Sequence, residues 1–206
     1  LISDPGQDPI GPDIKNNMIL LRNYQLEMIR SKEAQDEIII GSACTFSQIE
    51  KSNAVKTYCK ALWDSCVQIG GPHIRNLGTI GGNYCCNSPA ADTVPAILAL
   101  NCKIEYVEDL AVAFVFKKDN NRCGFRKVGK RNALAISSVT MAMNKSSNGE
   151  ITGAVGCCGP SVIVFKKTAA CLTEKKDIKE AKNLILTEIS PIDDKWGTVE
   201  YKNIVC

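Results

Sequence analysis

The segment GGPHIRNLGTIGGNYCCNSPAAD spans residues 70–92, and the rest of the chain can be read outward from it. Gly70 and Gly71 follow a helical pattern over residues 54–69, and Pro72 prevents that helix from continuing. Residues 77–87 then carry glycines at 78, 81 and 82, which predicts a loop. Asp92 is placed to cap a short helix. The segment is therefore predicted as a helix end, a glycine loop and a second, capped helix.

The predicted glycine loop has the composition of an anion site. Glycine permits positive φ angles and leaves backbone N–H groups uncovered, so that successive N–H groups can surround a diphosphate. Thr79 and Asn83 add side-chain donors. A tight turn with close packing is the plainer alternative, and these residues leave both readings open. The loop is not a Rossmann fingerprint, because Gly-x-Gly-x-x-Gly is absent, and not a Walker A loop, because no Gly-Lys-Ser/Thr follows.

Periodicity of the apolar residues predicts the remaining elements. Thr45 is placed as an N-cap, and Asn148-Gly149 is a hairpin signal. The composition changes after Asn121, where we place a boundary between a domain of residues 1–121 and one of residues 122–206. The predicted strands are residues 18–21, 37–41, 103–107, 112–116, 134–144 and 150–156, and the predicted helices are residues 46–51, 54–69, 178–189 and 196–206.

Composition excludes several classes of function. The 206 residues are 45% apolar and 23% charged, as in ordinary globular proteins. A net charge of +3 is too small to indicate nucleic-acid binding. Apolar runs fall short of the ~18 residues of a membrane span, and the polar start of the chain does not read as a signal peptide. We predict a cytoplasmic protein with no nucleic-acid partner and no membrane insertion.

Eleven cysteines and one histidine, His73, are the candidate metal ligands. None of the cysteines forms a Cys-x-x-Cys pair, and the adjacent pairs at 85–86 and 157–158 are poor chelators because neighbours on a strand point to opposite faces. An odd count also argues against a disulfide scaffold. We therefore predict no metal site and interpret most cysteines as small buried residues in a reducing compartment.

Longer matches connect the chain to a known family. Residues 74–83, IRNLGTIGGN, resemble the Ile-Arg-Asn-x-Ala-Thr-Ile-Gly-Gly-Asn stretch of the FAD-binding (medium) subunits of molybdenum hydroxylases, the xanthine dehydrogenase family. Residues 88–100, SPAADTVPAILAL, are similar to the continuation of that stretch. Residues 125–137, FRKVGKRNALAIS, are similar to the opening of the family's C-terminal domain. Shorter similarities lie at residues 21–23, 39–49 and 189–194.

The resemblance implies an α+β fold and an FAD site. The fold is a two-lobed FAD-binding domain of the PCMH/vanillyl-alcohol-oxidase type, followed by a smaller α/β domain of the CO dehydrogenase flavoprotein C-terminal type. The resemblance implies no catalytic residue. Lys127, or Arg126, is expected to approach the isoalloxazine, where a cation stabilises negative charge on reduced flavin; the alternative for Lys127 is a solvated surface lysine. The cofactor-binding residues implied are Gly78, Thr79, Ile80, Gly82 and Asn83, with the diphosphate at 78, 79, 82 and 83, and Ile69, Gly70, Cys86 and Asp92 near the flavin or its ribityl chain.

The same resemblance implies an electron-transferring oxidoreductase subunit. A molybdenum cofactor on one partner subunit oxidises a purine, an aldehyde or an N-heterocycle. Electrons pass through [2Fe–2S] clusters on a partner subunit to FAD on this chain, and then to NAD⁺ or another acceptor. Two alternatives stay open: a flavin-free structural subunit of such a complex, and another FAD oxidoreductase of the same fold.

The sequence departs from the family pattern at three places. The family's opening Ala-Gly-Gly-Thr-Asp-Leu loop has only Gly11 and Asp13 as counterparts here, and the segment at residues 107–111 is short. The chain also stops at Cys206, before the family's usual last helix. We expect missing segments rather than true deletions, because loss of a core strand would leave unpaired backbone groups.

Overall fold

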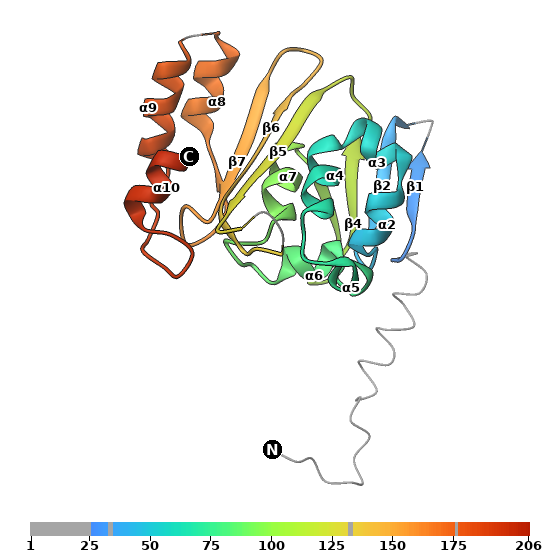
Figure 1. The fold of residues 1–206 in the computed structure, drawn as a ribbon. Coiled ribbons are helices and arrows are strands. Elements are labelled where there is room, and N and C mark those ends of the chain that lie inside the picture. The colour runs from blue at the N-terminus through green and yellow to red at the C-terminus, as the bar shows by residue number, and fades with distance from the viewer. Residues whose placement is uncertain (1–25, 33–34, 132–133, 176) are drawn as a thin grey trace, which may run out of the picture.

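Two four-stranded sheets with helices packed between and beside them make up the computed structural model (Figure 1). The structure describes residues 26–32, 35–131, 134–175 and 177–206. The predicted strand at residues 18–21 and the residues that replace the family's opening glycine loop lie outside the described residues. Neighbouring strands within each sheet run antiparallel. The mixture of helices and sheets is the predicted α+β fold class.

The first sheet has the strand order β1-β2-β4-β3. Its central strand β2 is an isoleucine run that is buried on both faces: Ile38 and Ile40 pack in the main core, and Ile39 packs with Val112 on the other side. Burial on both faces explains why this run is continuously apolar rather than alternating. The strands are β1 (Ile29–Lys32), β2 (Glu37–Gly41), β3 (Lys103–Val107) and β4 (Leu110–Lys117).

Three strand predictions in this half are confirmed. Residues 37–41 and 103–107 match β2 and β3, and residues 112–116 lie within β4. Val107 pairs with Leu110, so the shortened segment at this point is a two-residue hairpin turn.

The helices between β2 and β3 carry the candidate site. Thr45 caps the first of them, as predicted, and the structure shows that Gln48 completes a reciprocal capping box. The single helix predicted over residues 54–69 is wrong, because the chain leaves the helical region at Cys59 (φ −125°, ψ 46°). There the Ala61 amide donates to the Cys123 sulfur at 3.3 Å, which draws the backbone toward the second sheet. The helices are α2 (Phe46–Lys51), α3 (Asn53–Tyr58), α4 (Lys60–Val67), α5 (Pro72–Leu77), α6 (Ile80–Cys85) and α7 (Thr93–Ala99).

The second sheet has the order β5-β6-β7-β8, and α8, α9 and α10 pack beside it (Figure 1). The predicted Asn-Gly turn joins β6 to β7, with Gly149 at φ +91°. The predicted helix at residues 178–189 is confirmed as α9, whereas the last helix begins at Val199 rather than Trp196 because Thr198 caps it. The elements are β5 (Arg122–Gly129), β6 (Ser137–Lys145), β7 (Ile151–Gly156), β8 (Ile163–Val164), α8 (Lys166–Thr173), α9 (Ile178–Glu188) and α10 (Val199–Val205).

One apolar core joins the two sheets. Phe114 and Phe116 of the first sheet belong to the same buried cluster as Phe125 and Ala142 of the second. Helices α4 and α7 lie between the sheets and contact the second one. Asn121, where we predict the domain boundary, lies in the connection from β4 to β5. The site residues on α4 and α7 are therefore held directly against β5 and β6.

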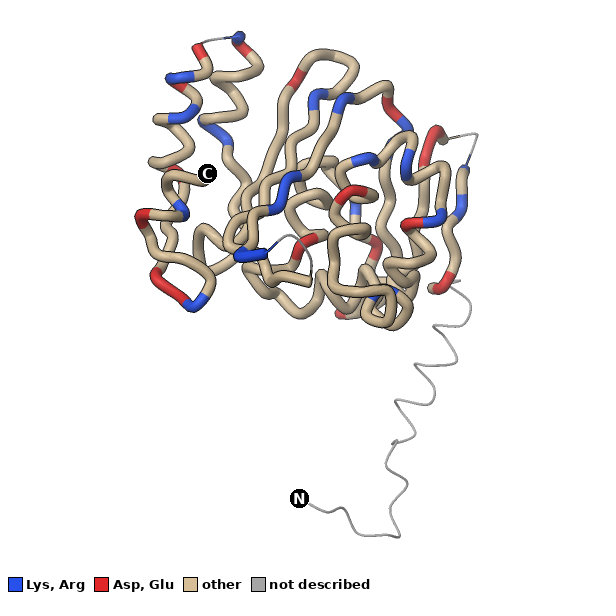
Figure 2. Tube along the Cα trace, viewed as in Figure 1, with Lys and Arg blue, Asp and Glu red and all other residues tan. Residues whose placement is uncertain are grey.

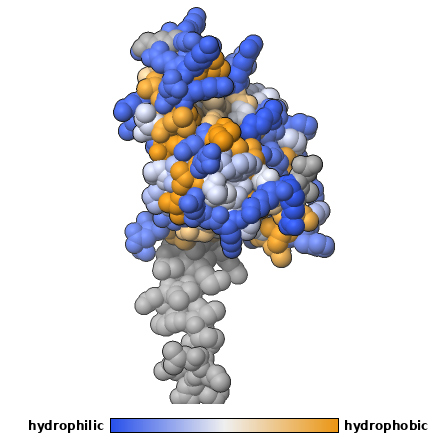
Figure 3. Space-filling view, turned by 60° about the vertical axis from the view of Figure 1, so that its left-hand side comes forward, coloured by the Kyte–Doolittle hydropathy of each residue, from blue (hydrophilic) through white to orange (hydrophobic). Residues whose placement is uncertain are grey.

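The surface and the cysteines agree with an ordinary globular chain. Charges of both signs are spread over both halves (Figure 2). Apolar residues are exposed among hydrophilic ones on the side of α9 and α10, where Ile178, Ile192 and Ile204 are accessible (Figure 3).

Burial raises the pKa of the Cys44 thiol to about 11, so the thiol is neutral. The buried cysteines are Cys44, Cys59, Cys66, Cys157, Cys158 and Cys171.

The described residues contain neither a candidate membrane span nor a cluster of possible metal ligands. None of their helices combines the length and the apolar character needed to cross a bilayer. Over the same residues, His, Cys, Asp and Glu side chains do not gather in threes around a possible metal ion.

Candidate functional site

Residues 78–83, called the glycine segment below, form a helix start rather than the predicted loop. Thr79 is the N-cap of α6, and its hydroxyl oxygen accepts from the Gly82 amide at 3.1 Å. Gly78 has φ −69°, and within the described residues only Gly70 and Gly149 are glycines with positive φ. The loop prediction is therefore wrong: Thr79 provides a cap, and Ile80 is fully buried in the core.

Close packing explains two of the glycines. A Cβ atom at Gly81 would lie 2.7 Å from the carbonyl oxygen of Ser42, and one at Gly78 would lie 2.6 Å from the ring of Phe46. The plainer alternative, close packing, accounts for these positions. The glycine segment is thus fixed against the chain that links β2 to α2.

Most backbone amides of the glycine segment are already hydrogen-bonded inside the protein. The expectation of a row of uncovered N–H groups is therefore wrong for five of the six residues, because a helix start packed on a neighbouring loop uses those groups. The side-chain donors Thr79 and Asn83 remain at the partly exposed surface. The bonds are Gly78 N to Ile74 O (2.7 Å), Ile80 N to Cys44 O (3.0 Å), Gly81 N to Ser42 O (2.9 Å), Gly82 N to Thr79 Oγ1 (3.1 Å) and Asn83 N to Thr79 O (3.0 Å).

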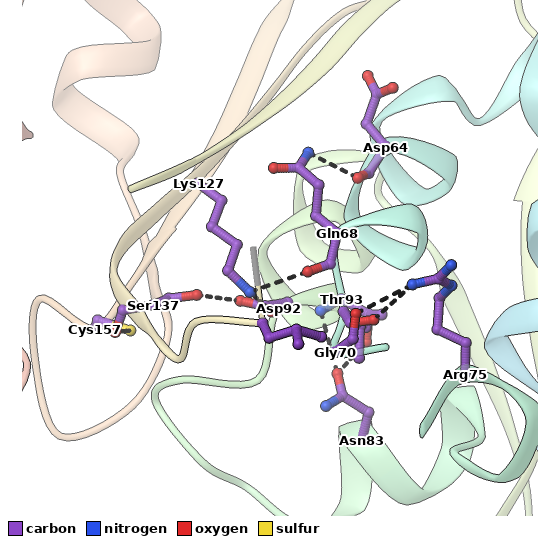
Figure 4. A network of polar contacts seen from close by, with 12 residues as sticks. Asp64, Gln68, Gly70, Arg75, Asn83, Asp92, Thr93, Lys127, Ser137 and Cys157 are labelled. Carbon is purple, nitrogen blue, oxygen red and sulfur yellow. Dashed lines mark hydrogen bonds and ion pairs between the residues drawn. The ribbon is translucent and has the colours of Figure 1, made fainter. Parts of the chain in front are cut away.

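Asn83 connects the glycine segment to the start of α7. Its Oδ1 atom accepts from the amide of Thr93 at 3.2 Å and from the Thr93 hydroxyl at 2.5 Å (Figure 4). Asn83 therefore caps α7 from a distance and takes the role that we predicted for Asp92. With Oδ1 used in this way, the side-chain nitrogen of Asn83 is the atom available to a ligand.

Asp92 and Lys127 form a buried ion pair. The Lys127 ammonium donates to Asp92 Oδ2 at 2.5 Å and to the carbonyl oxygen of Gln68 at 3.3 Å, while the Ser137 hydroxyl donates to Asp92 Oδ1 at 2.5 Å (Figure 4). The two charged side chains are only 9% and 10% exposed. These four residues are called the ion-pair network below.

The ion-pair network corrects two expectations. Asp92 occupies the N-cap position of α7, but its side chain makes no capping bond there because Lys127 and Ser137 bind both oxygens. Lys127 is not the solvated surface lysine of the alternative reading, since its ammonium is paired and buried. Burial, and then the charge of Asp92, raise the pKa of the nearby Cys157 thiol to about 12.

Arg75 holds the turn after α4. Its guanidinium donates to the carbonyl oxygens of Ile69 at 3.2 Å and Gly70 at 3.1 Å, and its Nε atom donates to Glu50 at 3.0 Å. Gly70 has φ +41°, a conformation that glycine adopts without strain. The predicted site residues Ile69 and Gly70 are therefore held by their backbones.

A cavity of about 470 Å³ opens between this turn, the end of β5 and the residues that lead into β6. Gly70, Arg75, Lys127 and Arg131 line it with polar and cationic groups, and Val67, Val128, Leu134 and Ala135 are the apolar residues of its wall. The exposed lining is more polar than apolar, which differs from the mainly apolar pockets typical of drug-sized ligands. The cations favour a ligand that carries or acquires negative charge.

The structure brings most of the predicted site residues together. Asn83 and Asp92 are linked through the first residue of α7, and Lys127 connects Asp92 to the cavity beside Gly70 (Figure 4). Gly78, Thr79 and Gly82 lie in the adjoining glycine segment. Ile80 is part of the core, and Cys86 is exposed at the end of α6, with its thiol donating to the Asn83 carbonyl.

Sequence reasoning missed the residues that hold these groups in place. Ser137 and Gln68 lie far from Asp92 in the chain, so periodicity gives no signal for them. Arg75 lies within the glycine-bearing stretch, and its position there was the one sequence sign that a side chain could bind the carbonyl oxygens of the nearby turn. Thr93 directly follows Asp92, and its need for a partner appears only in the structure, where it is fully buried.

Comparison with known proteins gives concordant results. Residues 15–111 match the family described as the FAD binding domain in molybdopterin dehydrogenase. The chain is 30% identical over 195 residues to the nicotinate dehydrogenase FAD-subunit of Eubacterium barkeri, covering 78% of this chain and 64% of the relative. It is 37% identical over 76 residues to the xanthine dehydrogenase FAD-binding subunit of Escherichia coli O157:H7, covering 37% of this chain and 26% of that protein. The chain thus spans less than two thirds of the length of either relative.

Solved structures show the same fold. Carbon monoxide dehydrogenase from Hydrogenophaga pseudoflava, which lacks the Mo-pyranopterin moiety of the molybdenum cofactor, aligns with a TM-score of 0.76 at 20% identity, over 87% of this chain and 74% of that one. Quinoline 2-oxidoreductase from Pseudomonas putida 86 aligns with a TM-score of 0.73 at 16% identity, over 87% and 73%. The predicted α+β fold is confirmed.

Proposed function

We propose that this chain, which is similar to FAD-binding subunits of molybdenum hydroxylases, binds FAD and acts as the flavoprotein of an electron-transferring oxidoreductase. The observation that carries the proposal is the convergence of Asn83, Asp92 and Lys127 beside a cation-lined cavity. FAD supplies the redox chemistry when bound, and this chain supplies its orientation and electrostatics.

The residues present fit FAD more closely at the flavin end than at the diphosphate end. The cavity offers an apolar wall for a ring and an ammonium, that of Lys127, for negative charge on the reduced ring. At the other end the amides of the glycine segment are largely occupied, so the Thr79 hydroxyl and the Asn83 side-chain nitrogen are the donors proposed for the diphosphate. Gly82 is exposed and leaves the backbone there uncovered by a side chain.

Partners complete the proposed function. In this reading a molybdenum cofactor and [2Fe–2S] clusters reside on partner subunits, and electrons pass through FAD on this chain to NAD⁺ or another acceptor in the cytoplasm. Names of relatives support the proposal, since the Eubacterium protein is called an FAD-subunit of nicotinate dehydrogenase. Exposed apolar residues on α9 and α10, such as Ile178 and Ile204, form the proposed contact surface for a partner.

A titration of the apoprotein with FAD tests the proposal. We expect the flavin fluorescence to change saturably, and Lys127→Met to weaken binding by about tenfold, the equivalent of ~1.4 kcal/mol. Lys130→Met is the matched control, because Lys130 is an exposed lysine three residues along the same segment. Equal affinities for both variants would remove Lys127 from the site.

The same preparation separates the alternatives. A flavin-free structural subunit gives no saturable signal, which would overturn the proposal. Another FAD oxidoreductase of this fold binds FAD but does not co-purify with molybdenum-containing and iron–sulfur subunits from its native source. Metal analysis of the complex captured with the full chain distinguishes these outcomes.

A further inference from the structure

We propose that Ser137 is a positioning residue for the ammonium group of Lys127, acting through Asp92. The inference rests on the proposed function, since the ammonium is placed for bound FAD. It goes beyond that function by assigning a role to a residue that lies outside the cavity. Ser137 is the first residue of β6 and is 1% exposed.

The argument starts from how the Asp92 carboxylate is divided. Oδ2 accepts from Lys127 and Oδ1 accepts from Ser137, each at 2.5 Å. A carboxylate can rotate about its last side-chain bond unless both oxygens are held. The hydroxyl on one oxygen therefore fixes the direction in which the other oxygen meets the ammonium.

The ammonium is held on a second side by the chain end of α4. Lys127 Nζ donates to the carbonyl oxygen of Gln68 at 3.3 Å, so two of its three hydrogens have acceptors. Lys127 also lines the cavity, which leaves the third hydrogen for a ligand there. Its position thus depends on a fixed backbone atom of α4 and on a carboxylate whose plane Ser137 sets.

Ser137 acts at a distance from the ligand. Ser137 is not among the described residues that line the cavity, although the nearby Leu134 and Ala135 are. Removing its hydroxyl therefore leaves the cavity wall unchanged and acts only on the ion pair. Without the hydroxyl, Oδ1 of Asp92 is a buried acceptor that lacks its partner, and the carboxylate is free to turn away from Lys127.

The neighbouring residue supplies a matched control. Ser138 is also buried, and its hydroxyl donates at 2.6 Å to the carbonyl oxygen of Trp196, outside the ion-pair network. Ser137→Ala and Ser138→Ala each remove one buried hydroxyl from β6. A merely structural role predicts the same loss of thermal stability in both variants and no difference in flavin properties.

The experiment measures FAD affinity and the flavin midpoint potential in the full chain. We expect Ser137→Ala to raise the dissociation constant for FAD about fivefold and to lower the midpoint potential, because a displaced cation stabilises reduced flavin less. Ser138→Ala should match the wild type in both measurements. Ser137→Cys, which keeps a weaker donor, should lie between them and replaces Ser137→Ala if that variant does not fold.

Each outcome is decisive. The positioning role is overturned if Ser137→Ala has the same FAD affinity and midpoint potential as the wild type. Where the alanine variant is unfolded, Ser137→Cys takes its place in this comparison. Either result leaves FAD binding intact. Equal changes in the Ser137 and Ser138 variants assign the effect to general loosening of β6 and also overturn it. Absence of FAD binding by the wild-type chain overturns both this inference and the proposed function.

Discussion

The glycine segment and the ion-pair network meet at the start of α7, yet they hold their polar groups in opposite ways. The glycine segment uses backbone atoms, which bond to the loop before α2 and to the first turn of α6. The ion-pair network joins three side chains, those of Asp92 before α7, Lys127 of β5 and Ser137 of β6, to one backbone carbonyl, that of Gln68 after α4. The glycine segment consists of consecutive residues, whereas the ion-pair network forms only through tertiary contacts. The more recognisable motif therefore supplies the rigid frame of the site, and the less recognisable network supplies its charge.

The strongest test of this comparison removes the cation. Lys127→Met leaves the buried Asp92 carboxylate with Ser137 as its remaining partner, so we expect the free energy of unfolding to fall by about 3 kcal/mol. The double variant Asp92→Asn/Lys127→Met removes both charges and should recover more than half of that loss. Urea denaturation of the wild type and the variants provides the measurement. A loss below about 1 kcal/mol in the single variant would show that the pair is solvated rather than buried.

A second test fills the space that a glycine leaves. Gly81→Ala places a Cβ atom 2.7 Å from the Ser42 carbonyl oxygen, a backbone atom that cannot turn aside, and we expect a loss of about 2 kcal/mol. Gly124→Ala is the control, because a Cβ at Gly124 meets nothing within 4 Å. Thermal unfolding of both variants gives the comparison. Equal stabilities would mean that Gly81 is kept for a reason other than packing.

Sequence reasoning succeeded where the signal is local. The isoleucine run at 38–40 predicted β2, and Thr45 predicted the N-cap of α2. It failed where a tertiary contact overrides the pattern. Cys59 breaks a helix whose periodicity is unbroken, because the Ala61 amide turns to Cys123. The glycines at 78 and 81 predicted a loop, since nothing in the sequence shows that Phe46 and Ser42 pack against them.

The candidate site divides in the same manner. The assignment of residues to FAD binding comes from resemblance to a family and stays a prediction. The residues assigned are Ile69, Gly70, Gly78, Thr79, Ile80, Gly82, Asn83, Cys86, Asp92 and Lys127. That Asp92 pairs with Lys127 required the structure, since 35 residues separate them in the chain. Ser137 could not be found from sequence, because a serine at the start of a strand has no distinguishing pattern.

A third test concerns the residue that joins the two regions. Asn83→Ala removes the oxygen that accepts from both the amide and the hydroxyl of Thr93, so we expect a loss of about 1 kcal/mol and weaker FAD binding. Asn76→Ala is the control, because its side chain accepts one exposed hydrogen bond from Ser47. Denaturation and FAD titration on the same samples separate the two effects. Unchanged stability with weaker binding would show that Asn83 serves the ligand alone.

The smallest expected effect concerns a helix outside the site that is also capped by a side chain from another segment. Glu188, at the end of α9, reaches the first turn of α8, where its carboxylate accepts from the amides of Lys166, Lys167 and Thr168 at 2.7–2.9 Å. Like Asn83, it caps a helix from another segment, but it does so with a charge at a partly solvated surface.

The pH dependence of stability follows from the sign of the Glu188 shift. Burial opposes the charged form, but the hydrogen bonds from Thr168, Lys167 and Lys166 together outweigh it and hold the pKa of Glu188 below its ordinary value of 4.5. A depressed folded-state pKa means that the stabilisation is fully present above pH 4.5 and is lost as the pH falls through the folded value. Glu188→Gln should lower stability by about 0.5–1 kcal/mol at neutral pH, and the difference should vanish in acid. Glutamine keeps one acceptor oxygen but presents an NH2 group where Oε2 accepts from Thr168, so a difference that persists in acid would assign the effect to the lost acceptor rather than to charge at the helix start.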